Sequence, residues 1–291
     1  MTGFFNVYKE AGYTSHDVVA IIRKLTRGKV GHTGTLDPQA EGVLPICLGR
    51  ATKLADMVMG QDKAYIAEVV LGVVTDTGDM TGEVVNQSLV SFDEAKILQV
   101  VEGFCGQQMQ MPPMYSAIKI GGKKLYELAR QGQVVERKPR GVNIESIKVL
   151  GFQPENNSFT IDVTCSKGTY IRSLCMDIGE ALGCGAAMGA LLRTRSGAFS
   201  LDTAVKIGDI RMVADEGRLN DLVLDVGKVL PFPRGDIKLE GMKMAKNGNT
   251  LPGNLVILPA RAEGKIWLYG PDGLVGLYSV EGSRLCLEVL M

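Results

Sequence analysis

The order of helical and extended segments is the feature of this sequence that most restricts its fold. Apolar residues recur at helical spacing after Ser15, after Ser91 and from Tyr170 onward, while β-branched residues dominate 63–76 and 158–165. Helices and strands therefore interleave, but without the regular strand–helix–strand alternation that builds a doubly wound parallel sheet. We predict an α+β fold with a mixed or antiparallel sheet.

Local signals indicate where these segments begin and end. Ser15 is expected to cap a helix that ends at Gly28, and Ser91 with Glu94 three residues later matches a capping box. After the first helix we expect a loop that runs to Gly49. The helix after Ser91 should turn four apolar residues inward: Ile97, Leu98, Val101 and Phe104. The following residues should share one face of a strand: Tyr65, Ala67, Val69, Leu71 and Val73.

The composition changes after about Leu230. The segment LPFPRGD is typical of a linker, and beyond it short apolar runs alternate with Gly-rich turns. About sixty residues of this kind predict a small β-barrel. We therefore expect a large domain over 1–230 and a small one over 231–291.

Length and hydropathy are those of an ordinary globular protein. The 291 residues, 45% of them hydrophobic, can fill a substantial core. The first fifteen residues contain no secretory signal, and the longest apolar run, 181–192, is shorter than the roughly 20 residues that span a bilayer. We expect a cytoplasmic protein that does not enter a membrane.

The cofactor and metal motifs are weak. The six cysteines are scattered without a Cys-x-x-Cys pair, which argues against zinc and disulfides and predicts reduced, mostly buried thiols. The segment LGCGAAMGALL has dinucleotide-like glycine spacing, but it follows a helix instead of a strand. Asp76 and Asp79 in TDTGDMTG lack the further acids of a calcium loop, so a turn is favoured there.

One carboxylate stands out in the stretch GHTGTLDPQAEGVLP, residues 31–45. Its glycines and prolines surround Asp37, and the apolar GVLPICLG that follows would anchor the loop. A rigid loop that presents one acid suits a nucleophile or a general base, but Asp-Pro in a Gly-rich segment also forms simple turns. His32, five residues earlier, is equally open between a packing role and a ligand contact.

The charges are balanced overall and clustered locally. Lys plus Arg equals Asp plus Glu at 32 each, so net charge does not indicate a polyanionic partner. Seven basic residues against two acidic ones lie between Lys119 and Arg140. This cluster could neutralise phosphates or form a solvated basic face.

At the Asp37 loop the sequence resembles a known family. The segment VGHTGTLDPQAEGVLPICLGRATK is very similar to the signature of the TruB family of tRNA pseudouridine synthases. Three later segments resemble the family's other motifs in order: KAYIAEVVLGVVTDTGD, MPPMYSAIKIGGKKLYELARQG and GTYIRSLCMDIGEALGCGA. The resemblance covers most of residues 3–200 and implies a pseudouridine synthase catalytic domain that acts on uridine 55 in the T loop of tRNA.

The resemblance also implies roles for single residues. Asp37 matches the family's catalytic aspartate, Tyr65 the tyrosine that packs on the flipped base, and Arg172 the expected partner of Asp37. His32, Tyr170 and Leu191 match the remaining substrate-binding positions, His32 being the residue that enters the T loop. The isomerisation involves no redox step and no external group, so no cofactor or metal is expected.

RNA recognition is expected to rest on shape and phosphates. The basic segment overlaps the family's mobile thumb-like insertion, here called the thumb and placed at about 119–140; its expected backbone contacts are Lys119, Lys123, Lys124 and Arg130. Residues 231–291 resemble a PUA-like RNA-binding module. The implied partner is the T stem-loop of tRNA, bound by a monomer. The alternative from another class is a catalytically silent protein that only binds or folds tRNA.

Overall fold

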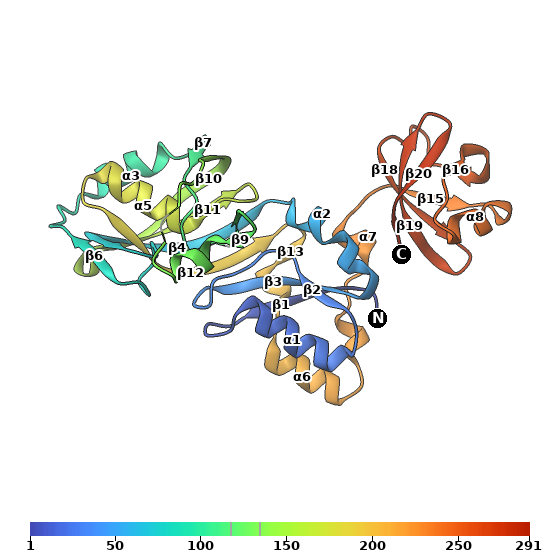
Figure 1. The fold of residues 1–291 in the computed structure, drawn as a ribbon, viewed down its shortest axis with the longest axis horizontal. Coiled ribbons are helices and arrows are strands. Elements are labelled where there is room, and N and C mark those ends of the chain that lie inside the picture. The colour runs from blue at the N-terminus through green and yellow to red at the C-terminus, as the bar shows by residue number, and fades with distance from the viewer. Residues whose placement is uncertain (117, 134) are drawn as a thin grey trace.

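Ten strands of the described chain form one mixed sheet. The computed structural model describes residues 1–116, 118–133 and 135–291, except for the side chains of Ile120 and Lys124. The strand order is β14 (Val205–Lys206), β1 (Gly3–Lys9), β3 (Glu41–Leu48), β12 (Ala186–Ser196), β4 (Lys63–Leu71), β11 (Ser158–Cys165), β10 (Arg140–Gln153) and β7 (Gly106–Gln110), with β2 (Val30–His32) beside β3 and β13 (Phe199–Ser200) beside β12. The β1–β14 and β3–β12 pairs are parallel and the other pairs antiparallel, which confirms the predicted α+β fold (Figure 1).

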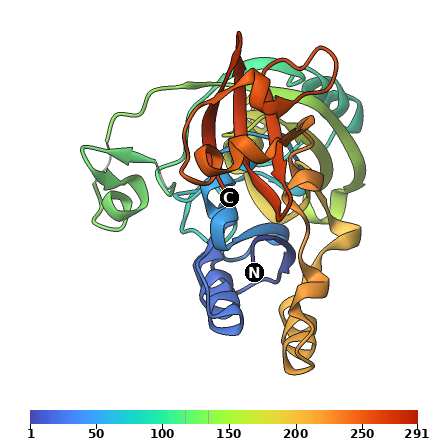
Figure 2. The same ribbon diagram turned by 90° about the vertical axis from the view of Figure 1, so that its right-hand side faces the viewer.

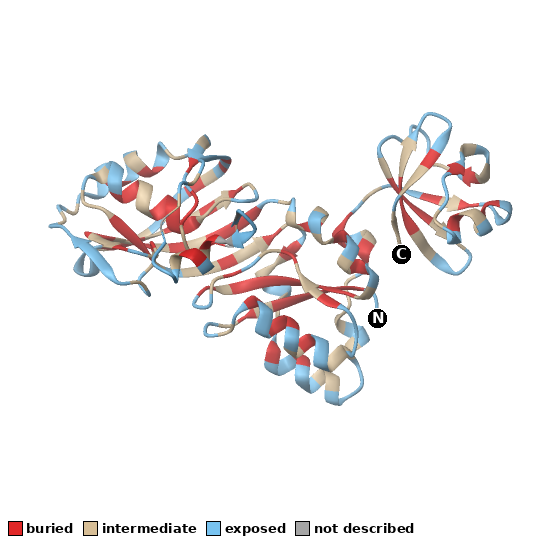
Figure 3. Cartoon of the chain, viewed as in Figure 1, coloured by how far each residue is buried: buried red, intermediate tan, exposed pale blue. Residues whose placement is uncertain are grey.

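One continuous cluster of buried apolar side chains joins four helices to this sheet. The helices are α1 (Ser15–Thr26), α3 (Glu94–Glu102), α5 (Ile171–Leu182) and α6 (Ile207–Asp215). Helices α1 and α6 lie together near β1, while α3 and α5 pack beside β10 and β12 (Figure 1). Figure 3 shows the buried residues concentrated along the strands and on the inner sides of these helices.

Several predicted element boundaries are wrong by one or two residues. Thr14, not Ser15, caps α1 and forms the capping box with Asp17, and the helix ends at Thr26 with Arg27 in the left-handed conformation. In α3 the cap is Asp93, so the capping box predicted from Ser91 and Glu94 does not form. Hydroxyls and carboxylates at neighbouring positions can each accept the first free amides, so sequence alone does not choose between them.

Two predictions about buried faces also fail. Leu98 is 46% exposed, although Ile97 and Val101 on the same helix are buried. Val73 does not continue the face of β4, because Gly72 at φ +78° turns the chain into a separate strand, β5 (Val73–Thr75). Strand β5 pairs with β6 (Val84–Gln87) in a short ribbon.

The loop that holds Asp37 is shorter than expected. It ends at Ala40, and Glu41–Leu48 form β3, a central strand between β1 and β12. A strand buried on both faces has a continuous apolar sequence without alternation, which is why GVLPICL does not look like a strand. After β3 the chain continues through a 3₁₀ helix (Gly49–Leu54) and α2 (Ala55–Met59).

The segment predicted to be the thumb contains its own small elements. Strands β8 (Lys119–Ile120) and β9 (Lys123–Lys124) pair, and α4 (Leu125–Ala129) follows. In Figure 2 this green segment stands away from the main sheet.

The end of the chain forms the predicted barrel. Within residues 234–290, six strands follow the order β16 (Leu251–Pro252), β20 (Arg284–Leu290), β19 (Gly273–Glu281), β18 (Lys265–Gly270), β15 (Arg234–Ile237) and β17 (Val256–Ile257), and the sheet nearly closes (Figure 1). Trp267 of this sheet lies in one apolar cluster with Phe4 and Val43 of the first sheet. Its indole donates to the carbonyl of Leu230 at 2.7 Å.

The remaining helices are short. They are α7 (Val226–Val229), α8 (Met242–Lys246) and single 3₁₀ turns at Pro154–Asn156, Leu201–Thr203, Leu219–Leu222, Leu239–Gly241 and Gly253–Leu255. None of the helices in the described parts of the chain is long and apolar enough to cross a membrane. The six cysteines are free, but Cys105 is exposed and Cys184 and Cys286 are half-buried, so the expectation of mostly buried thiols holds only for the other three.

Candidate active site

Asp37 lies in the loop between β2 and β3. Buried side chains bind the backbone of this loop and hold it in place. The Ser15 hydroxyl accepts a hydrogen bond from the Leu36 amide at 2.9 Å and donates to the Leu36 carbonyl at 3.2 Å. Ser15 is 1% exposed, so water does not compete for these bonds. Ser15, which does not cap α1, thus fixes the loop next to Asp37.

A buried ammonium supports the other side of the loop. Lys9 has no exposed surface, and its Nζ donates to the carbonyls of Pro38 at 3.0 Å and Ala40 at 2.6 Å. Burial lowers the pKa of Lys9 to about 8, against the opposing charges of Glu41 and Asp37. Lys9 therefore keeps its proton at neutral pH and holds the loop through charge-assisted bonds.

Arg172 binds the Asp37 carboxylate with two nitrogens. Its Nε lies 3.0 Å from Oδ2 and its Nη2 3.3 Å from Oδ1, so the ion pair implied by the resemblance is present. The guanidinium is 5% exposed and also donates to the carbonyls of Thr77 at 3.1 Å and Tyr115 at 2.7 Å. The planar guanidinium, with its fork of N–H donors, supplies a positive charge and also fixes the orientation of its partner. The Asp37 carboxylate is therefore held in one rotamer.

Asp79 is a second carboxylate at this ion pair, and the sequence prediction missed its contact. Its Oδ2 lies 3.8 Å from Arg172 Nε, while its Oδ1 accepts from the Thr77 hydroxyl at 2.9 Å and the Thr81 amide at 3.0 Å. The segment is indeed a turn after a strand, as predicted. Position in the turn does not reveal which distant side chain an acid will face.

Opposing influences act on the Asp37 carboxyl. Desolvation by the surrounding loop raises its pKa, and the negative charge of Asp79 adds to this, while Arg172 and Lys9 act in the other direction. The net direction is upward, although the ion pair alone would lower the pKa. The side chain nevertheless stays 39% exposed, so a substrate atom can reach this comparatively basic carboxylate.

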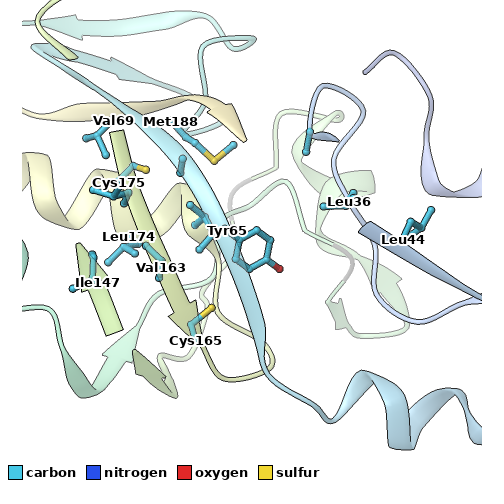
Figure 4. Packing of buried hydrophobic residues seen from close by; sticks show 14 of the residues in the cluster. Leu36, Leu44, Tyr65, Val69, Ile147, Val163, Cys165, Leu174, Cys175 and Met188 are labelled. Atoms are coloured by element: carbon cyan, nitrogen blue, oxygen red, sulfur yellow. The ribbon is translucent and has the colours of Figure 1, made fainter. Parts of the chain in front are cut away.

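Tyr65 provides an aromatic surface near the loop. It lies on β4 and is 9% exposed, and burial raises the pKa of its hydroxyl. Figure 4 shows the ring directed away from the strand toward the segments that carry Leu36 and Leu44. Leu191 of β12 stands opposite Ala67 of β4, two residues from Tyr65, and so lines the same face of the sheet.

Tyr170 is placed by a buried glutamine. It precedes the first residue of α5, and Gln110 at the end of β7 spans its backbone: Gln110 Oε1 accepts from the Tyr170 amide at 2.8 Å and Nε2 donates to the Tyr170 carbonyl at 3.0 Å. Ser173 donates to the Met111 carbonyl at 2.7 Å. These bonds tie the start of α5, and hence Arg172, to the segment that leads into the thumb.

His32 ends β2 and borders the loop. Its ring lies 5.4 Å from that of His16, edge to face. Its Nδ1 is buried, and among the described residues it has no hydrogen-bond partner. Burial, with the nearby His16 and Arg193, lowers the pKa of His32 to about 4, so the ring is neutral at physiological pH.

The predicted backbone contacts lie apart from this cluster. Lys119, Lys123 and Arg130 are exposed, and the Arg130 guanidinium lies 5.5 Å from the Tyr126 ring centroid. The side chain of Lys124 lies outside the described residues. The structure thus gathers Asp37, Arg172 and Tyr65, and leaves the thumb cations on a separate projection.

The gathered groups suit one kind of chemistry. An oriented carboxylate of raised pKa beside an aromatic ring can attack, or take a proton from, a flat heterocycle that lies on the ring. Among the described residues, no group of His, Cys, Asp and Glu side chains is arranged to hold a metal ion.

Comparisons with known sequences agree on one family. The model described as TruB family pseudouridylate synthase (N terminal domain) matches residues 23–171, and that of the tRNA pseudouridylate synthase B C-terminal domain matches 172–231. The tRNA pseudouridine synthase B of Lachnoclostridium phytofermentans is 51% identical over 301 aligned residues, covering 99% of this chain and 98% of that protein. The protein of the same name from Alkaliphilus oremlandii is 48% identical and covers 88% and 85%.

Two solved structures are similar along nearly the whole chain. A chain in the crystal structure of a Cbf5-Nop10-Gar1 complex is 28% identical with a TM-score of 0.73, covering 99% of this chain and 84% of that one. A chain of an H/ACA RNP bound to a substrate RNA containing 2′-deoxyuridine is 26% identical with a TM-score of 0.72, with the same coverage.

Proposed function

The chain belongs to the TruB family of pseudouridylate synthases, and from this premise we propose that it isomerises uridine 55 in the T loop of tRNA, with Asp37 as the nucleophile. The names of its close relatives support tRNA as the substrate. The observation that carries the proposal is the two-nitrogen contact of Arg172 with Asp37, which orients a reachable carboxylate and favours its ionised form.

The reaction itself needs only groups of this kind. The N1–C1′ bond of uridine breaks, the base turns, and a C5–C1′ bond forms; the C5 proton leaves and N1 takes up a proton. A carboxylate that attacks C1′ or C6 retains the reacting partners between cleavage and rejoining. Desolvation and Asp79 raise the pKa of Asp37 and so make its carboxylate more nucleophilic than a free one, while Arg172 favours the charged form.

A uridine folded into a tRNA loop must leave its stack to reach Asp37, which costs a few kcal/mol. Stacking on the Tyr65 ring would return about 1–3 kcal/mol. The neutral ring of His32 is suited to enter the opened T loop, since an uncharged ring loses little hydration there. Tyr170 and Leu191 complete the proposed pocket.

The outer parts of the chain are proposed to grip the RNA. The exposed cations Lys119, Lys123 and Arg130 would meet phosphates, together with Lys124. We assign residues 1–230 to the catalytic domain, with the thumb at about 119–140, and 231–291 to a PUA-like module. Since one chain supplies every proposed active-site group, we expect a monomer acting in the cytoplasm, where tRNA is found.

The proposal is tested with a tRNA transcript that carries tritium at C5 of its uridines. The protein should release tritium from this transcript, Asp37→Asn should not, and a transcript with cytidine at position 55 should yield none. Asp209→Asn, an exposed acid on α6, is the matched control and should keep full activity. Background release from the unaltered protein, with tRNA binding retained, would favour the silent RNA-binding alternative.

A second variant tests the stacking role. Tyr65→Ala should slow single-turnover release more than it weakens tRNA binding, because most of the affinity is proposed to lie in phosphate and shape contacts. A loss confined to affinity would contradict this role.

A further inference from the structure

A buried arginine next to the active site has no ionic partner. Arg193 on β12 is 1% exposed, and among the described residues it takes part in no ion pair. Burying an unpaired guanidinium is costly unless other groups satisfy its donors. Here the backbone does so: Nε donates to the Val43 carbonyl at 2.7 Å and Nη2 to the Gly34 carbonyl at 3.1 Å.

The two carbonyls that Arg193 binds belong to the two ends of the Asp37 loop. Gly34 and Val43 lie on opposite sides of Asp37 along the chain, one entering the loop and one just inside β3. The guanidinium therefore bridges the two ends of the loop. Gly34 lies at φ +117°, a backbone conformation that favours glycine, and in this conformation its carbonyl accepts the bond from Nη2.

Arg193 is also the cross-strand neighbour of Tyr65. It stands directly opposite Tyr65 in the β12–β4 pairing, and its positive charge opposes the rise in the pKa of the Tyr65 hydroxyl. Paired residues on antiparallel strands point to the same face of the sheet. One rigid fork therefore binds both ends of the Asp37 loop and lies on the same face of the sheet as Tyr65.

The sheet is built so that Arg193 reaches this position. Strand β3 passes so close to β12 that a Cβ on Gly42 would lie 2.3 Å from the Arg193 carbonyl oxygen, so only glycine fits there. The pairing register shifts between Arg193 and Arg195, which places Arg195 opposite Ala64. Two arginines two residues apart consequently point to opposite faces, and Arg195 lines a surface hollow instead.

We propose that Arg193 is a positioning residue that fixes the Asp37 loop against Tyr65, so that the nucleophile and the stacking ring keep one separation as the substrate base enters. This inference rests on the proposed function. Arg193 does not contact the substrate in this role; it acts through the backbone of the loop and through Tyr65. Its charge, which no carboxylate neutralises among the described residues, also favours the neutral form of His32 and so supports the same arrangement.

The test compares two arginines on one strand. Arg193→Lys keeps the charge but loses the fork, and should lower the single-turnover rate of tritium release about 100-fold while tRNA affinity stays within about threefold. Arg195→Lys should leave both unchanged. Thermal unfolding of each variant establishes that the rates refer to folded protein.

Chemical rescue separates positioning from a general loss of structure. In Arg193→Ala, guanidinium at tens of millimolar should restore the rate at least tenfold, while potassium chloride at equal concentration should not. A near-normal rate for Arg193→Lys, a loss that lies wholly in affinity, or absence of rescue in folded Arg193→Ala would overturn the inference. If the unaltered protein releases no tritium, the proposed function fails; if only these variants behave otherwise than expected, the inference fails alone.

Discussion

Arg172 contacts both carboxylate oxygens of Asp37, through Nε at 3.0 Å and Nη2 at 3.3 Å. The same guanidinium donates to the carbonyls of Thr77 and Tyr115, so three separate loops converge on it. A guanidinium held in this way cannot rotate with the carboxylate. Asp37 therefore presents one oxygen geometry to whatever approaches it.

Replacement of Arg172 by lysine should show how much the two-nitrogen contact contributes to the reaction rate. Arg172→Lys retains a positive charge but not two parallel bonds, and we expect a fall of about 100-fold or more in single-turnover tritium release, with tRNA affinity nearly unchanged. Filter binding measures the affinity. Arg218→Lys, on an exposed surface pair with Asp221, is the control and should be silent. A loss of affinity that accounts for the whole effect would assign Arg172 to RNA binding instead.

Asp79 should tune the Asp37 carboxyl. Its charge raises the pKa of Asp37, so Asp79→Asn should lower that pKa and move the acid limb of the pH–rate profile to lower pH. At neutral pH the rate should fall about tenfold, because a less basic carboxylate is a weaker nucleophile and Arg172 loses a neighbour. Asp76→Asn is the control from the same turn, since Asp76 accepts from the Glu83 amide instead. An unmoved acid limb would show that Asp79 does not act on the pair.

The sequence predicts the architecture better than the geometry of the site. Glycines and prolines around Asp37 are enough to predict a stiff loop that presents an acid, because Pro fixes φ and Gly allows tight turns. The partnership with Arg172, 135 positions later, is implied only by the family resemblance. The contact of Asp79 is not predictable for a related reason: it depends on how a turn packs against α5, and no local pattern encodes that packing.

Individual side chains also show that long-range contacts are harder to predict than local structure. Ser15 has the sequence signature of a helix cap, yet Thr14 takes that role and Ser15 holds Leu36 instead. Lys9 shows nothing in sequence that would distinguish it from a surface lysine, but the fold buries it completely. Such residues are found only when long-range packing is known, because their neighbours are distant in sequence.

Gln110 should matter for both stability and rate. Gln110→Met removes both bonds to the Tyr170 backbone and leaves the Tyr170 amide unsatisfied, while the carbonyl keeps its bond from the Leu174 amide; the loss should cost about 1–3 kcal/mol of unfolding free energy. Because the start of α5 then loosens, the single-turnover rate should also fall, with little change in tRNA affinity. Gln107→Met on the exposed face of the same strand serves as control. Full stability in Gln110→Met, measured by urea unfolding, would contradict the role of this side chain.

His32 should make the protein sensitive to mild acid. Its pKa of about 4 in the folded chain lies below the ordinary value of 6.5, so between these pH values the unfolded chain binds more protons. Stability should therefore fall as the pH drops from 6.5 toward 4. The loss from pH 7 to pH 5 should be about 1–2 kcal/mol, allowing for the partly exposed ring. In His32→Gln this part of the pH dependence should vanish.

Proton NMR provides an independent measurement, because the chain has only two histidines. The ring resonance that disappears in His32→Gln identifies His32, and in the unaltered protein it should titrate near pH 4. Urea unfolding at pH 7 and pH 5 then compares the two proteins. If the resonance titrates between pH 6 and 7, or if both proteins lose equal stability, the ring is not held neutral by burial. A pKa between 6 and 7 would leave a fraction of the rings charged near neutral pH, and each charged ring would have to lose its hydration on entering the T loop.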